Sequence, residues 1–61
     1  MEQTDARRLA REVGAETGMI AVAVTKDRYQ GRWDQTHEWG VSIGGHWYGN
    51  VVALREAHPR P

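Results

Sequence analysis

The segment HEWGVSIGGHW, residues 37–47, combines a strand pattern with a turn. From His37 to Ile43 every second residue is bulky, and the residues between them are polar or small. Such alternation is typical of a strand with one buried face. The two glycines after Ile43 can both adopt the positive φ that a tight hairpin turn requires. The segment therefore predicts an antiparallel hairpin, with one strand over residues 33–43 and the next over residues 46–55.

The length of this turn decides which side of the last strand faces the core. A two-residue turn points Tyr48 and Leu54 at the core, and it also sets Gly40 opposite Gly49. The neighbouring Trp47 can then cover those two bare glycines diagonally. A three-residue turn points Trp47 at the core instead. Both turns remain open, as does a short helix over residues 51–57, because residues 51–54 are apolar on both faces.

An earlier strand is predicted over residues 19–28, where MIAVAVT alternates large and small apolar side chains. A two-residue turn at Gln30 and Gly31 would pair positions whose numbers sum to 61, so that Val22 faces Trp39. The bulky residues of both strands then share one core-facing side. They are Ile20, Val22, Val24, His37, Trp39, Val41 and Ile43.

A helix is predicted over residues 5–17. Its apolar residues have the spacing of an amphipathic helix, with Thr4 as the expected N-cap and Gly18 as the expected end. The apolar stripe consists of Ala6, Leu9, Ala10 and Val13. Together with a tail over residues 56–61, these elements predict one α+β domain spanning residues 1–61, with the helix packed on a three-stranded meander in the order αβββ.

The small size of the chain predicts a homodimer. Burial of apolar surface in a chain of this mass contributes about 90 kcal/mol. Ordering 61 residues costs about the same, so the monomer is marginal. Cysteine is absent, which excludes disulfides. We expect a second copy to cover the sheet face that carries Met19, Ala21 and Ala23, with Trp47 and Val51 as further candidates for that face.

Composition excludes some classes of function. Eight Lys and Arg residues balance eight Asp and Glu residues, which disfavours nucleic-acid binding driven by net charge. The longest apolar stretch, Met19–Val24, is too short to span a bilayer, and no signal segment opens the chain. We therefore expect no membrane partner and a cytoplasmic location. No sequence pattern indicates a cofactor.

The predicted tip of the first hairpin is the main candidate for partner binding. Arg28, Tyr29, Arg32 and Trp33 are residue types that dominate protein–protein hot spots. The alternative is that Tyr29 and Trp33 fold back to extend the core. Trp39, in the middle of a predicted strand, is expected in the core.

These features favour a small non-enzymatic binding module that docks onto another protein, as a stoichiometric inhibitor or regulator does. One alternative is a nucleic-acid-binding ribbon or sheet, helped by a small anion patch at Arg7, Arg8 and Arg11 on the helix. A second alternative is a small enzyme or metal site around His37 and His46. The histidine spacing matches no zinc motif, so no catalytic or metal-binding residue is predicted.

Overall fold

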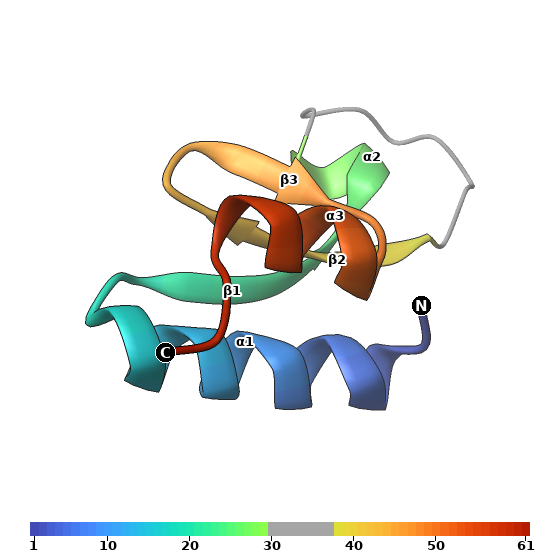
Figure 1. Cartoon of the computed structure of the whole chain (residues 1–61). Helices are drawn as coiled ribbons and strands as arrows, with labels where there is room; N and C mark the ends of the chain where they lie inside the picture. Colours follow the sequence, from blue (N-terminus) through green and yellow to red (C-terminus); the bar gives the residue numbers. More distant parts are fainter. Residues whose placement is uncertain (30–37) are drawn as a thin grey trace.

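A computed structural model describes residues 1–29 and 38–61, and the statements below concern those residues. The elements follow the order α1 (Gln3–Thr17), β1 (Ala21–Thr25), α2 (Lys26–Tyr29), β2 (Trp39–Ile43), β3 (His46–Tyr48) and α3 (Val51–Ala57). The described strands form one antiparallel sheet in the order β1-β2-β3, with helices beside it (Figure 1). The predicted α+β class is confirmed.

Helix α1 buries the apolar stripe predicted for it: Ala6, Leu9, Ala10 and Val13. It ends at Gly18, which has a left-handed φ of 73° and donates its N–H to the carbonyl of Gly14, as expected for a glycine C-cap. The predicted start was wrong. Glu2 has the extended backbone of an N-cap residue, so Thr4 lies inside the first turn.

The predicted pairing of the first two strands was wrong by three positions. Val22 lies opposite Ser42 rather than Trp39, and Thr25 lies opposite Trp39. Because side chains alternate along a strand, an odd shift exchanges the two faces. Ala21, Ala23 and Thr25 therefore share the core side with β2, whereas Val22 faces outward and is 51% exposed. The predicted turn at residues 30–31 lies outside the described residues.

The small side chains on one face of β1 explain why this face, and not the one with Val22, turns toward the core. A side-chain carbon placed on Gly14 would lie 3.7 Å from Cβ of Ala21, so α1 and β1 approach closely at that point. Valines on this face of the strand would hold the helix further away. The larger side chains of Val41 and Ile43 on β2 then fill the space beneath the helix and are fully buried. The face expected to bind a second copy is thus covered by the chain's own helix.

The first strand is also shorter than predicted. Strand β1 spans only Ala21–Thr25, and residues 26–28 of the predicted strand belong to the single helical turn α2. Strand β2 begins at Trp39, while residues 33–37 of its predicted range lie outside the described residues. Trp39 is half-buried and packs against the core, in partial agreement with its predicted place.

The predicted turn at Gly44 and Gly45 is confirmed, with φ values of 62° and 80°, and of the two lengths left open it has the shorter one, two residues. The long strand after it was wrong, since β3 ends at Tyr48. Asn50 is the N-cap of α3, and its side chain accepts a hydrogen bond of 2.8 Å from the N–H of Ala53. Helix α3 continues to Ala57, so the short helix considered as the alternative is the structure observed, and residues 56–57 of the predicted tail belong to it.

Helices α1 and α3 pack on the same face of the sheet. Among the described residues, a single cluster of buried side chains joins α1, β2 and α3, with Leu54 as the buried residue of α3. Met1, Ala21, Ala23, Trp39 and Tyr48 pack around this cluster. No helix in the described ranges is long and apolar enough to cross a bilayer. The opposite face of the sheet, called the outer face here, carries Val22, Val24, Gly40, Ser42 and Trp47.

Charged side chains join α3 to α1. Arg55 donates two hydrogen bonds to the carboxylate of Glu16, at 2.5 and 3.3 Å, and lies 3.6 Å from Glu12. Arg60 in the tail lies 3.8 Å from the same Glu12 carboxylate. The hydrogen bonds from Arg55 lower the pKa of the Glu16 carboxyl below its ordinary value, and they raise the pKa of Arg55. These pairs connect α3 and the tail that follows it to α1.

Candidate docking surface on the outer face of the sheet

Trp47 lies across the outer face of the sheet. Its indole covers the bare backbone at Gly40 and Gly49, where a methyl group would lie only 2.6 and 2.8 Å from ring carbons. The indole Nε1 reaches from β3 over β2 and donates a 3.1 Å hydrogen bond to the carbonyl of Val24 on β1. The predicted covering of the glycine pair by Trp47 is confirmed. The ring forms a flat, half-buried floor in the middle of this face.

Helix α2 folds over the same face. The Nζ of Lys26 lies 5.7 Å from the ring centroid of Trp47, within the range of a cation–π contact. The hydroxyl of Tyr29 donates a 2.6 Å hydrogen bond to the carbonyl of Gly45 in the hairpin turn. Tyr29 thus lies against the body of the domain and still has 41% of its surface exposed.

Aliphatic side chains continue the surface beyond Trp47. Ile20, which directly precedes β1, is 86% exposed, and Val22, within β1, is 51% exposed. Met19 is also exposed, and its methyl group lies 3.2 Å from the position that a side-chain carbon on Gly44 would occupy. Large apolar side chains so exposed in one area are typical of a surface that binds a partner. We call Ile20, Val22, Lys26, Tyr29 and Trp47 the outer-face surface.

The outer-face surface contains one residue of the predicted hairpin tip. Tyr29 belongs to it, and Arg28 is exposed in the same helical turn. Arg32 and Trp33 lie outside the described residues. Sequence reasoning missed Ile20 and Val22 as surface residues because the wrong pairing placed them in the core. The sequence signal for the outer face was the expected pair of Gly40 and Gly49 with Trp47 next to it.

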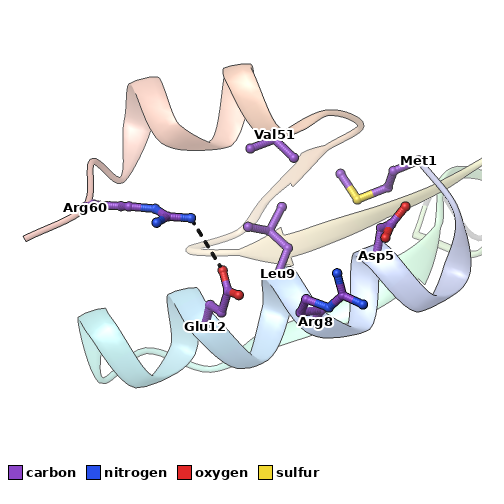
Figure 2. A pocket seen from close by; sticks show the side chains of 7 residues that line it. All are labelled: Met1, Asp5, Arg8, Leu9, Glu12, Val51 and Arg60. Carbon is purple, nitrogen blue, oxygen red and sulfur yellow. Dashed lines mark ion pairs between the residues drawn. The ribbon is translucent and has the colours of Figure 1, made fainter.

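The three arginines predicted as an anion patch are all exposed on α1, but they do not point the same way. Arg8 lines a shallow hollow between α1 and α3, whereas Arg7 and Arg11 do not (Figure 2). Arg7 and Arg11 are four residues apart and therefore share one side of the helix. The patch is thus a pair of arginines with a third turned toward the hollow.

The hollow itself has a volume of about 240 Å³ and an apolar floor with a charged rim. Its lining residues are Met1, Asp5, Arg8, Leu9, Glu12, Val51 and Arg60. Figure 2 shows the ion pair between Arg60 and Glu12 at one end of this rim. The rim carries two charges of each sign, so it selects for neither a cationic nor an anionic ligand. The volume is below the range usual for small-molecule sites.

The histidines form no cluster in the described part of the chain. His46 is exposed on β3, and His58 packs edge-on against Tyr48 at 6.0 Å between ring centroids. His37, the other half of the hypothetical metal or catalytic pair, lies outside the described residues. Residues 1–29 and 38–61 contain no group of three or more His, Asp or Glu side chains placed to hold a metal ion.

Comparison with known protein families, with curated proteins and with solved structures finds no match to this chain. The residues and geometry of the chain itself therefore provide the basis for inferring its function. The chain is a small α+β domain in which α1 and α3 cover one face of the sheet and the other face, beside α2, has exposed apolar side chains.

Proposed function

We propose that this chain is a non-enzymatic docking module that binds another protein through its outer-face surface, in the manner of a stoichiometric inhibitor or regulator. The observation that supports this is the exposure of Ile20 and Val22 beside the flat Trp47 ring. Both α1 and α3 pack on the opposite face, so the fold leaves these side chains in water. Burying an exposed aliphatic side chain contributes about 1.5–3 kcal/mol of favourable free energy, and binding of a partner over these side chains would gain it.

The arrangement resembles the anatomy of known interfaces. Tyr29 and Trp47 supply aromatic area that is already ordered by hydrogen bonds, which reduces the entropy lost on binding. Lys26 and Arg28 supply charge at the border of the apolar area. An interface with an aromatic and aliphatic centre and a polar border is the usual protein–protein pattern.

Capture from a lysate of the native host tests the proposal. The wild-type chain as bait is compared with the double variant Ile20→Lys, Val22→Lys, which places two charges on the surface without disturbing a buried residue. The double variant Val51→Lys, Val52→Lys is the matched control, since both valines are exposed on α3. We expect the wild type and the control to retain one partner in equal molar amount and the outer-face variant to lose it. A partner lost only with the α3 variant would overturn the proposal.

We further propose that the chain self-associates as a homodimer, as its size suggests. Within the described residues only seven hydrophobic side chains are buried, and two of them are alanines. The outer face is the apolar surface that a second copy would share. Sedimentation equilibrium of the purified chain tests this. A folded monomer at micromolar concentration would contradict the dimer without affecting the docking proposal.

A single-stranded nucleic acid is the second candidate partner. The observation in its favour is Lys26 above the half-buried Trp47 ring, a combination that suits a stacked base with a neighbouring phosphate. Titration with a short oligonucleotide at two salt concentrations would detect such binding through quenching of tryptophan fluorescence. Tight binding that weakens steeply with salt would favour this candidate over a protein partner.

A further inference from the structure

We propose that the free edge of β1 binds an extended segment of the partner protein in which acidic and apolar residues alternate. The inference rests on the proposed docking function and specifies the chemistry of the partner. It is drawn from three features of the described residues: the direction of the backbone groups of β1, the side chains of that strand, and the distribution of charge around α1.

Alternate backbone groups of β1 point away from the sheet. The N–H of Lys26 donates to the carbonyl of Glu38 at 2.9 Å, so these two residues form a hydrogen-bonded pair of the ladder. Such pairs alternate along an antiparallel ladder. Val22 and Val24 therefore face β2 with their backbone groups, while those of Ala21, Ala23 and Thr25 point toward the free edge. The edge offers the N–H groups of all three residues and the C=O groups of Ala21 and Ala23, whereas the C=O of Thr25 is in the position that accepts the first hydrogen bond of α2.

Strand β1 itself has no charged side chain, proline or bulge to protect its edge. Residues 18–25 contain no charged residue and no proline, and β1 pairs without interruption over its whole length. Natural edge strands normally carry a lysine, a proline or a bulge to prevent pairing with another chain. Val22 on the outer face of β1 and Ile20, which directly precedes this strand, are both exposed and apolar. An added strand would cover both.

Charge is separated across α1. Asp5, Glu12 and Glu16 share the side of the helix that faces α3, because Glu12 and Glu16 pair with Arg55 and Asp5 lines the hollow. Arg7 and Arg11 lie on the other side, which they share with Gly14. A side-chain carbon on Gly14 would contact Ala21, so this basic side lies along β1.

Figure 1 shows α1 running alongside β1, the edge strand of the sheet, and the buried side chains of α1 also pack against β2. The basic side of α1 and the backbone edge of β1 thus border the same strip of surface. In an added strand, every second side chain would point toward α1 and the remaining ones toward the outer face. Acidic residues complement Arg7 and Arg11 on the first side, and apolar residues cover Ile20 and Val22 on the second.

This charge pattern favours such a segment over a second copy of the chain at the same edge. A symmetric pairing would bring residues 18–25 of the second copy to the strip, and that stretch contains no acidic residue. The two arginines would then gain no countercharge from the strand. The strip therefore matches an acidic extended segment in both charge and side-chain alternation.

The probe for the test is an octapeptide of alternating glutamate and valine, capped at both ends, with an octapeptide of alternating lysine and valine as its control. Binding is followed by amide resonances of the isotopically labelled full chain. We expect the glutamate peptide to bind and to slow hydrogen exchange at the amides of Ala21, Ala23 and Thr25, with little change at Val22 and Val24. The lysine peptide is expected not to bind.

Two variants with equal charge change complete the test. Arg7→Glu is expected to weaken binding of the glutamate peptide about tenfold, because it places like charge beside the strip. Arg8→Glu, on the neighbouring residue turned toward the hollow, is expected to change affinity less than about twofold. Circular dichroism shows whether both variants remain folded. Equal losses in the two variants, or protection of Val22 and Val24 instead of their neighbours, would overturn the inference.

The result can be separated from that of the lysate experiment. A chain that ignores the peptide but still captures a host protein through Ile20 and Val22 overturns this inference and leaves the docking function standing. Self-association that protects the same three amides in the absence of peptide would also overturn it, since the edge would then belong to a second copy.

Discussion

The indole Nε1 of Trp47 on β3 donates a hydrogen bond to the carbonyl of Val24 on β1, across the intervening strand β2. The ring can lie this low because β2 presents Gly40 beneath it. A single side chain therefore links β1 and β3, the two edge strands of the sheet. It also forms the floor of the proposed docking surface, so the stability and the function of this face share one residue.

Trp47→Phe tests the contribution of this contact between the edge strands to stability. Phenylalanine keeps part of the ring contact but loses the hydrogen bond and some of the covered area, so we expect a loss of about 1–2 kcal/mol in the free energy of unfolding. Denaturation in urea measures the change. Tyr29→Phe, which removes an exposed hydrogen bond to Gly45, is the comparison and should cost less. A greater loss for Tyr29→Phe would contradict the assigned role of Trp47.

Gly40→Ala tests the space beneath the ring. The added methyl group would lie 2.6 Å from two ring carbons of Trp47 and would also overlap the backbone carbonyl of Tyr48, which cannot move aside easily. We expect a loss of about 1–3 kcal/mol or more. Gly14→Ala is the matched control, since its methyl group meets neighbours at 3.4 Å and beyond. Alanine is favoured over glycine inside a helix by about 1 kcal/mol, so this variant should be neutral or stabilised. Equal destabilisation by both substitutions would contradict the packing described here.

Asn50→Ala tests the cap that starts α3. The side-chain oxygen of Asn50 satisfies the N–H of Ala53, and removing it should cost about 1 kcal/mol in unfolding free energy. Asn50→Asp keeps an acceptor at the same place and should restore most of the loss. Chemical denaturation of the three proteins gives the comparison. If the aspartate variant is as unstable as the alanine variant, the cap is not the source of the effect.

The ion pair between Glu16 and Arg55 predicts a dependence of stability on pH. The pKa of Glu16 is lower in the folded chain than its ordinary value of 4.5, so the folded state binds that proton less readily than the unfolded state. The stabilisation is therefore complete above pH 4.5 and is lost as the pH falls through the lowered value. Melting temperatures measured from pH 6 downward should fall less for Glu16→Gln than for the wild type.

Glu56→Gln is the control for that series, because Glu56 is exposed and makes no ion pair with any residue in the described ranges. Its melting curve should follow that of the wild type at each pH. An acid-induced fall of equal size in all three proteins would show that the pair with Arg55 does not determine the response.

The local signals in the sequence were sufficient for the buried side and the end of α1 and for the position of the second hairpin turn. The apolar spacing of Ala6, Leu9, Ala10 and Val13 and the glycine at position 18 need no distant partner to be interpreted. The same holds for the turn at Gly44 and Gly45, whose φ values favour glycine whatever surrounds them. The contact of Trp47 with the paired glycines followed from that turn.

The pairing of β1 with β2, the end of β3 and hence the identity of the exposed face depended on tertiary structure. Val22 and Ala23 are both plausible core residues by hydrophobicity, and only the close approach of α1 at Gly14 selects the smaller side chain. Likewise, Val51 to Leu54 suit a strand or a helix, and the helix forms because Asn50 caps it and Leu54 reaches the core. The sequence alone therefore determined the buried side and the end of the first helix and the position of the tight turn, since these depend on neighbouring residues, whereas the length of that turn was left open. Which face of the sheet remains open to a partner was decided by the packing of residues far apart in the chain.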